Sequence, residues 1–93
     1  MLYTPQARAD LRDISRFTDA RWGREQRMGY LGRLKNRFPQ LANHPQTGRK
    51  RYEIVGAPYS FHEGRHVIFY QEIEDGIEVL RLLHDAMDFP RHF

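Results

Sequence analysis

The feature that most constrains the fold of this chain is a change in the spacing of its apolar residues, between residues 43 and 52. Before this point apolar side chains recur every three or four residues, which is typical of amphipathic helices. After it they alternate or form short runs, which is typical of strands. We therefore expect an α+β protein, in which an N-terminal helical hairpin packs on one face of a curved, mainly antiparallel β-sheet.

The first half of the chain predicts two helices within about residues 5–43, joined by a short break. Thr4-Pro5 is a helix start signal, because the Thr hydroxyl can accept a free amide hydrogen and Pro tolerates the first helical position. Trp22-Gly23 is the expected break, since Gly readily adopts a positive φ at a helix end. The apolar positions with helical spacing are Ala7, Leu11, Ile14, Phe17 and Thr18, followed by Met28, Leu31, Leu34, Phe38 and Leu41.

Four residues in this half have specific expected roles. Pro39 is expected to kink the second helix or to end its main run, because the residue before a proline is disfavoured in the α region. Gly29 and Gly32 each cost about 1 kcal/mol in a helix interior, and we expect them to let the two helices approach closely. Trp22 is expected to be a structural plug at the turn between the helices.

The second half predicts a sheet over about residues 49–84. Strands are expected at residues 52–55, 59–62, 66–73 and 77–84. Tight turns are expected at Glu63-Gly64 and at Asp75-Gly76, the second being a type I′ turn with two positive φ angles. Tyr3 is expected in a short edge strand, and residues 85–93 form the C-terminal tail of a single domain spanning residues 1–93.

Length and cysteine content exclude several classes of function. A chain of 93 residues has room for one hydrophobic core but not for a separate cofactor domain, so no cofactor is expected. The sequence has no cysteine, which excludes disulfides, thiol nucleophiles and Cys-ligated metals. It also lacks a membrane-spanning run and a signal-peptide pattern, so we expect a soluble cytoplasmic protein without a membrane partner.

The net charge of +3 is unevenly distributed along the chain. Residues 1–51 contain 12 Lys and Arg but only 4 Asp and Glu, whereas residues 52–93 contain 3 and 8. The two parts therefore carry net charges of +8 and −5. This polarity favours protein partners over direct sequence-specific DNA binding, for which a more uniformly basic chain is expected.

The histidines are the first candidates for chemistry. His62 and His66 flank a predicted turn and could face each other, but without a third ligand no metal site is expected. His84 lies near Asp85 and Asp88, and a His–carboxylate pair can support general base catalysis. A structural bond from Asp88 to His84 or to a backbone amide is the favoured interpretation.

Two basic features in the strand region are candidates for partner binding. Arg81 lies in an apolar run, so we expect it to face an acidic partner or to pair internally with a residue such as Glu53. The run Arg49-Lys50-Arg51, followed by Tyr52, suits a phosphate or an acidic peptide. The alternative for this run is a solvated edge strand whose charges prevent aggregation.

Four stretches of the sequence together resemble the ParE toxins of the RelE/ParE superfamily. They comprise residues 7–14, 18–26 and 44–49, and the segment from strand 66–70 to residues 81–88. The resemblance follows chain order over nearly the whole sequence. Its most distinctive parts are the segment around Trp22-Gly23 and the closing Leu83-His84 and Met87-Asp88.

The resemblance implies the toxin of a type II toxin–antitoxin module. ParE-like toxins are described as poisons of DNA gyrase that block replication without established catalytic residues, and a ParD-like antitoxin neutralises them. By resemblance, the toxic surface would include the C-terminal residues His84, Met87, Asp88, Phe89 and Arg91. We expect the antitoxin to bind the sheet and its edges at Arg49, Arg51, Tyr59, Phe61, Tyr70 and Arg81.

The main alternative within the superfamily is a RelE-like, ribosome-dependent mRNA endoribonuclease, which would use His84, Arg81 and His92. The chain departs from that pattern, because Met87 stands where relatives often carry Arg and the C-terminal segment contains no Tyr. The strand that opens Arg65-His66 also has no Arg within it. A third alternative is a toxin fold retained only to titrate an antitoxin.

Overall fold

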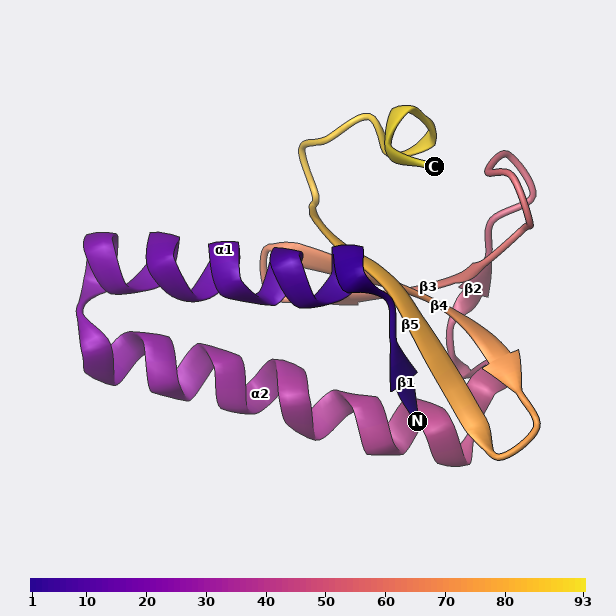
Figure 1. Cartoon of the computed structure of the whole chain (residues 1–93), viewed down its shortest axis with the longest axis horizontal. Helices are drawn as coiled ribbons and strands as arrows, with labels where there is room; N and C mark the ends of the chain where they lie inside the picture. The colour runs from indigo at the N-terminus through magenta and orange to yellow at the C-terminus, as the bar shows by residue number, and fades with distance from the viewer.

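The computed structural model describes the backbone of residues 1–93 and all side chains except those of Asp19, Arg21, Trp22, Arg24, Gln26 and Arg27. The predicted role of Trp22 therefore lies outside the described residues. The helices and strands follow in the order β1 (Leu2–Tyr3), α1 (Pro5–Trp22), α2 (Arg24–Asn43), β2 (Arg49–Lys50), β3 (Tyr59–Glu63), β4 (His66–Ile73) and β5 (Gly76–His84) (Figure 1). Short 3-10 helices at Pro45–Thr47 and Phe89–His92 precede β2 and end the chain.

Helix α1 begins where the sequence predicts it. The Thr4 hydroxyl accepts a hydrogen bond from the Ala7 amide at 3.0 Å and donates one to the Leu80 carbonyl of β5 at 2.6 Å. One residue thus caps the helix and ties it to the sheet. Gly23, with a φ of 88°, separates α1 from α2, which confirms the predicted glycine break.

Helix α2 runs through Pro39 to Asn43, so the prediction that this proline ends the main run of the helix is wrong. Pro39 is exposed, whereas Phe38 and Leu41 are fully buried. Their burial holds the helix together across the turn in which proline removes a hydrogen bond. The predicted close approach at Gly29 and Gly32 is also wrong, because an added Cβ would meet nothing within 4 Å among the described atoms.

The strands form one five-stranded sheet in the order β1-β5-β4-β3-β2. β1 runs parallel to β5, and all other neighbouring strands are antiparallel. The structure therefore confirms the predicted α+β class, with a helical hairpin on a mainly antiparallel sheet. The strands predicted at Tyr3, 59–62, 66–73 and 77–84 agree with β1, β3, β4 and β5 to within one residue.

Three local predictions in the sheet are wrong. Residues 52–56 form turns and a bend in place of the predicted strand, and Ile54 packs inward from this loop. The β4–β5 turn lies at Glu74 and Asp75, and Gly76 already pairs with Ile73 as the first residue of β5. The turn between β3 and β4 lies at residues 64–65, one residue later than predicted.

A β-bulge in β5 determines which of its residues reach the helices. Phe69 pairs with Arg81 and Tyr70 pairs with Val79, so Leu80 is the extra residue of β5. Because of this bulge, Val79 and Leu82 both face the helices although they are three residues apart. The helix-side core comprises Ala7, Ile14, Leu34, Phe38, Leu41, Ile68, Tyr70, Ile77, Val79 and Leu82.

A second and smaller apolar cluster lies on the opposite face of the sheet, because Val67 and Phe69 alternate with core residues along β4. This outer cluster comprises Ile54, Val67, Phe69 and Leu83, with Leu80 and Phe89 packed against it. In Figure 1 the loop between β2 and β3 and the C-terminal segment project from the sheet on the side away from α2. These two irregular segments cover the outer cluster.

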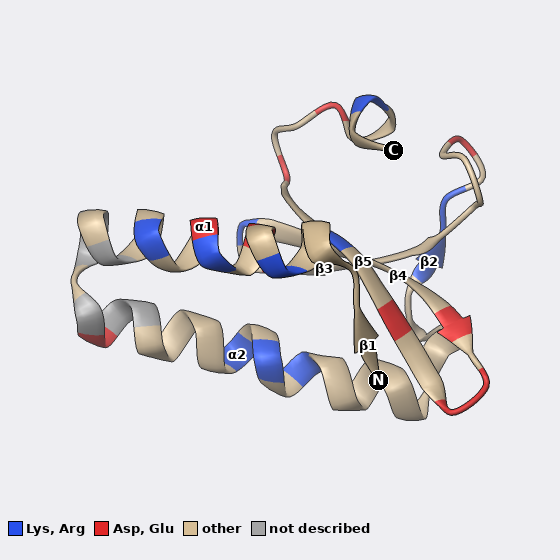
Figure 2. Ribbon diagram, in the orientation of Figure 1, with Lys and Arg blue, Asp and Glu red and all other residues tan. Residues whose placement is uncertain are grey.

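The uneven charge along the chain is also uneven in space. Figure 2 shows Lys and Arg along both helices and at β2, whereas Asp and Glu gather around the β4–β5 turn. Over the described residues, neither helix is long and apolar enough to cross a membrane.

Candidate functional site

The basic residues and the C-terminal segment singled out by the sequence meet on the outer face of the sheet. A cavity of about 410 Å³ lies there, lined by Arg49, Arg51, Ser60, His62, Val67, Asp85 and Phe89. β2 and β3 supply its basic and polar wall, and the segment after β5 supplies Asp85 and Phe89. Of the residues predicted to bind partners, this cavity brings together Arg49, Arg51 and Phe89, whereas Tyr59 and Phe61 lie on the helix-side face of β3.

Arg51 is held in a defined position within this site. Its Nε donates to the Ser60 hydroxyl at 2.7 Å, and its Nη1 lies 3.2 Å from a Glu53 carboxylate oxygen. Its guanidinium lies 5.5 Å from the centre of the Phe89 ring, which links the residue after β2 to the C-terminal segment. Arg49 is exposed at the same edge. The edge therefore carries two positive charges, one on Arg51, whose side chain is held in place, and one on the solvated side chain of Arg49.

Tyr59 and Phe61 line β3 as half-buried aromatic residues, each with a cation above its ring. The Lys50 ammonium lies 4.8 Å from the centre of the Tyr59 ring, and the Arg37 guanidinium lies 4.7 Å from that of Phe61. Both rings therefore keep an apolar body next to a positive charge, which suits a partner with apolar and acidic groups.

Tyr70 is fully buried, so the structure removes it from the predicted binding surface. Its hydroxyl donates to the Pro45 carbonyl at 2.7 Å and accepts a hydrogen bond from the Gly48 amide at 2.9 Å. Burial raises the pKa of Tyr70 above its ordinary value. Its ring stacks against Tyr59 at 5.5 Å between centroids, so Tyr70 supports the surface from inside.

Arg81 pairs internally, as one of its two expected alternatives had it, but its partner is Asp10 of α1 and not Glu53. Its Nε and Nη2 lie 2.8 and 3.0 Å from the two Asp10 carboxylate oxygens, and its Nη1 donates to the His92 carbonyl at 3.1 Å. The hydrogen bonds to Asp10 raise the pKa of Arg81. Asp10 also accepts the Leu82 amide of β5 at 2.9 Å, so one carboxylate joins helix, strand and guanidinium.

Asp85 takes the place predicted for Asp88 beside His84. One Asp85 carboxylate oxygen lies 3.4 Å from His84 Nδ1, and the other lies 3.1 Å from His62 Nε2. The Ala86 amide donates to the same His84 nitrogen at 3.1 Å. Asp85 thus bridges the ends of β3 and β5, and the predicted anchoring by the Asp88 side chain is wrong because that residue caps the last turn without a side-chain hydrogen bond.

His62 and His66 do not face each other across the hairpin, because the register pairs His62 with Val67 and His66 with Glu63. The two imidazoles therefore lie on opposite faces of the sheet. His66 instead contacts Tyr30 of α2, with 2.6 Å between its Nδ1 and the hydroxyl oxygen. Among the described residues, the structure brings together no three His, Asp or Glu side chains able to hold a metal ion.

The residues predicted for target binding follow one another along the C-terminal segment. His84 ends β5 and is half-buried, whereas Met87, Asp88 and Arg91 are exposed. Phe89 packs edge-on against Phe69 at 5.0 Å between ring centres. The segment is therefore anchored by aromatic contacts to Phe69 and presents Met87, Asp88 and Arg91 to solvent.

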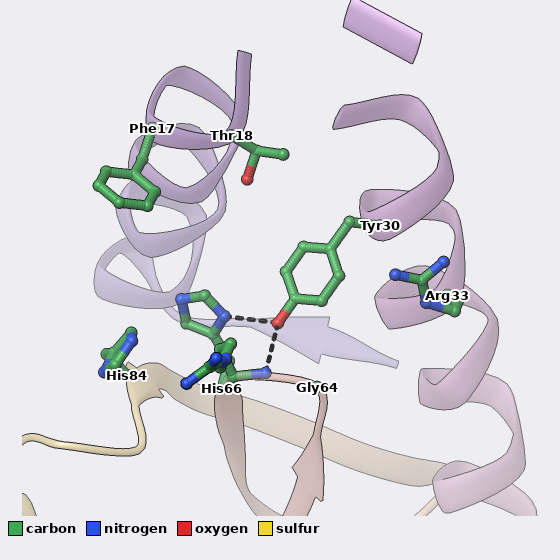
Figure 3. A pocket seen from close by; sticks show the side chains of 8 residues that line it. Phe17, Thr18, Tyr30, Arg33, Gly64, His66 and His84 are labelled. Carbon is green, nitrogen blue, oxygen red and sulfur yellow. Dashed lines mark hydrogen bonds between the residues drawn. The ribbon is translucent and has the colours of Figure 1, made fainter. Parts of the chain in front are cut away.

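Sequence reasoning missed two residues, Asp10 and Tyr30. Each lies on a helix at a position outside the apolar spacing, and each reaches a strand residue far along the chain. Asp10 reaches Arg81, and Tyr30 reaches His66, as Figure 3 shows. The sequence carries one weak signal for Asp10, namely an arginine in an apolar strand that requires a carboxylate. It carries none for Tyr30.

Comparisons with known proteins agree over nearly the whole chain. The family model described as the ParE toxin of the type II toxin–antitoxin system parDE matches residues 1–89. A Mycobacterium tuberculosis protein named Toxin ParE1 is 36% identical over 92 residues, which cover 98% of this chain and 94% of that protein. A Caulobacter vibrioides protein with the same name is 32% identical over 87 residues, which cover 94% and 90%.

A solved structure agrees with the fold. The structure titled "Chromosomal ParDE TA system from P. aeruginosa" superposes with a TM-score of 0.73 at 18% identity, over 88% of this chain and 90% of that chain. At this identity the likeness supports the fold alone. The family match and the two relatives carry the assignment: the chain belongs to the ParE toxins of type II toxin–antitoxin systems.

Proposed function

We propose that this toxin arrests growth by binding DNA gyrase and trapping its cleaved-DNA state, and that a ParD-like antitoxin neutralises it. The observation that carries this proposal is the family match over residues 1–89, together with two Toxin ParE1 relatives aligned over nearly their full lengths. Because gyrase acts on chromosomal DNA, the proposed place of action is the cytoplasm.

The proposed action is non-catalytic, and the state of Arg81 supports this. The ribonuclease alternative would use Arg81 with His84 and His92, yet all three guanidinium nitrogens of Arg81 already have partners within the chain. A phosphate in a cleavage reaction would have to compete with the bidentate Asp10 carboxylate. Binding through a surface requires no such exchange.

The proposed antitoxin surface is the β2–β3 edge of the sheet, with Arg49, Arg51, Tyr59 and Phe61 as its contacts. Its cations lie beside aromatic rings, which favours a segment with alternating acidic and apolar side chains. Tyr70 and Arg81 are assigned supporting roles, since one is buried beneath Tyr59 and the other is paired with Asp10.

The proposed gyrase contact is the C-terminal segment, with His84, Met87, Asp88, Phe89 and Arg91. Met87, Asp88 and Arg91 are exposed, and the aromatic contact between Phe89 and Phe69 fixes their direction. This surface adjoins the antitoxin surface at Arg51 and Phe89. A bound antitoxin would therefore cover part of the gyrase contact.

Gyrase supercoiling and DNA-cleavage assays, with and without the cognate antitoxin, test this proposal. We expect the purified toxin to inhibit supercoiling and to accumulate cleaved DNA, and the antitoxin to reverse both effects. The M87A/R91A variant should lose most of the inhibition, whereas Arg12→Ala on the exposed face of α1 should retain it. Unimpaired gyrase at every toxin ratio, or cleavage of translated message in primer extension, would contradict the proposal.

Calorimetry with the antitoxin tests the second surface. Arg49→Glu should weaken binding at least tenfold, about 1.4 kcal/mol, because it reverses an exposed charge at the proposed contact. Arg8→Glu makes the same charge change on α1 and should leave the affinity within about twofold. Equal losses in both variants would indicate attraction by net charge and would move the antitoxin away from the β2–β3 edge.

A further inference from the structure

A second cavity, of about 560 Å³, lies between the helical hairpin and the start of β4, separate from the residues of the outer-face site. Figure 3 shows Phe17 and Thr18 of α1 on one side, Tyr30 and Arg33 of α2 on the other, and His66 and His84 at the base. Its volume falls within the range of about 300–1,000 Å³ that is typical of small-molecule sites.

Tyr30 and His66 form a preorganised pair in this cavity. The Tyr30 hydroxyl accepts the Arg65 amide at 3.1 Å, and its oxygen lies 2.6 Å from His66 Nδ1 and 3.2 Å from the Glu63 carbonyl. The single hydroxyl hydrogen is donated to the Glu63 carbonyl, and the hydroxyl oxygen accepts from the Arg65 amide and from the Nδ1 hydrogen of a neutral His66, which satisfies all three contacts. These bonds hold the Tyr30 ring and the His66 imidazole in fixed orientations at the cavity.

The charged side chains that line the cavity are all basic among the described residues. Arg33 and Arg65 line it, and none of its described lining residues is an Asp or Glu. The adjoining cavity along α1 differs, since Asp10 and Asp13 line it together with Arg81. Among the described side chains, neither Arg33 nor Arg65 forms an ion pair, whereas Arg37, Arg51 and Arg81 each do.

The cavity also has an aromatic side chain on each of two sides, Phe17 on α1 and Tyr30 on α2. Phe17 is 59% exposed, and Tyr30 presents its ring beside Arg33, whose guanidinium lies 5.4 Å from the ring centre. Aromatic rings together with two guanidinium groups at one cavity suit a ligand with a ring at one end and a doubly charged oxyanion at the other.

We propose that this cavity binds a nucleoside monophosphate, with the phosphate held by Arg33 and Arg65 and the base packed between Phe17 of α1 and Tyr30 of α2. A phosphate monoester carries a charge of about −1.5 to −2 at pH 7, which matches two guanidinium groups better than a single carboxylate does. An inorganic phosphate would leave the two aromatic side chains and most of the volume unused. The inference does not depend on gyrase or antitoxin binding.

The test is an NMR titration of the full-length toxin with AMP, adenosine and inorganic phosphate. AMP should produce saturable shifts of the His66 side-chain nitrogens and of the Gly64, Arg65 and His84 amides. Adenosine and inorganic phosphate should each bind at least tenfold more weakly than AMP. The R33Q/R65Q variant should lose at least tenfold in AMP affinity, whereas R8Q/R12Q, which removes the same charge from exposed positions on α1, should bind like wild type.

Several outcomes would overturn the proposal. Shifts spread over the α1 surface, or equal losses in the two double variants, would show attraction by net charge. Inorganic phosphate binding as tightly as AMP would remove the role of the base. Absence of a saturable shift in the wild-type spectrum would dismiss the site even if R33Q/R65Q failed to fold.

Discussion

The helix-side core and the outer cluster occupy the two faces of the same sheet, yet they are covered in different ways. The helix-side face packs against two long helices and contains most of the buried apolar side chains, whereas the outer face packs against a loop and the C-terminal segment. The contacts that attach these covering segments to the sheet also differ. Helix α1 is joined to β5 by hydrogen bonds of Thr4 and Asp10. The C-terminal segment is held by edge-on contacts of Phe89 and Phe93 with Phe69, by the hydrogen bond from Arg81 to the His92 carbonyl, and by the contact between Asp85 and His62.

This difference separates stability from binding. The face covered by the helices buries most of its side chains, and it opens only at the cavities between the hairpin and the ends of β4 and β5 among the described residues. A face covered by short irregular segments leaves cavities and cations at its rim, as at Arg49 and Arg51. Such segments also open locally at lower free energy than helices packed on a core. The proposed gyrase contact and the two arginines of the proposed antitoxin surface lie on the outer face, whereas Tyr59 and Phe61 of that surface lie at the helix-side edge of β3.

The largest expected effect tests the helix-side core. Phe38 is fully buried between α2 and the sheet and contacts Tyr3 edge-on at 5.5 Å. Phe38→Ala should lower the free energy of unfolding by about 3–5 kcal/mol, because it removes a large buried ring and leaves a cavity. Urea denaturation would measure this loss. A loss below that of the outer-cluster variant described below would contradict the comparison between the faces.

A smaller effect is expected from the pair that joins α1 to β5. Asp10→Ala removes the bidentate partner of Arg81 and the acceptor of the Leu82 amide, and should lower the free energy of unfolding by about 2–3 kcal/mol. The neighbouring exposed Asp13 provides a matched control, since Asp13→Ala should change stability by no more than about 0.5 kcal/mol. Similar losses for the two variants would show that the Asp10 contacts add nothing specific.

The outer cluster should tolerate truncation better. Phe89 is half-buried, and its ring contacts Phe69 and the Arg51 guanidinium. Phe89→Ala should cost about 1 kcal/mol in unfolding free energy, because only part of the side chain is removed from water. It should also increase amide hydrogen exchange in residues 85–93 and leave α1 and α2 protected. Faster exchange in the helices would indicate that the two faces unfold as one unit.

The smallest effect is confined to acid pH and concerns His66. Burial, together with the charge of His84, lowers the pKa of His66 from 6.5 to about 4. The unfolded chain then binds this proton more readily than the folded one, so the His66 contribution to stability falls as pH decreases from 6.5 to about 4. NMR titration should place the His66 midpoint near 4, and His66→Gln should flatten this part of the stability curve. A titration midpoint of His66 near 6.5 would contradict this prediction and show that its imidazole is solvated.

Periodicity predicted most of the fold because each element buries one continuous face. The apolar runs at 66–73 and 77–84 mark β4 and β5 almost to the residue, and Thr4 and Gly23 mark helix boundaries through local chemistry. Pro39 shows where the local rule fails: a helix held by buried residues on both sides of a proline continues through it. The strand predicted at residues 52–55 is wrong for a related reason. The alternation of polar and apolar residues there is short, and it buries Ile54 alone.

The candidate sites were only partly predictable. The basic run at 49–51 and the C-terminal segment were identified from composition, and the structure places them around one cavity. Tyr70 was misassigned because an alternating strand does not reveal which face is covered by helices. Leu80 adds a second difficulty, because a bulge reverses the alternation after Val79 and no residue type marks it.

By itself, the sequence determined the element types, their order and the family. The element types and their order follow from the local spacing of apolar residues, and the family follows from short motifs in the chain. The tertiary structure decided the partners of the charged and polar residues. Asp10 meets Arg81 across 71 residues, and Tyr30 meets His66 across 36. The physical reason is that a hydrogen bond requires two groups within about 3 Å, and the packing of helices on a sheet brings such distant groups together.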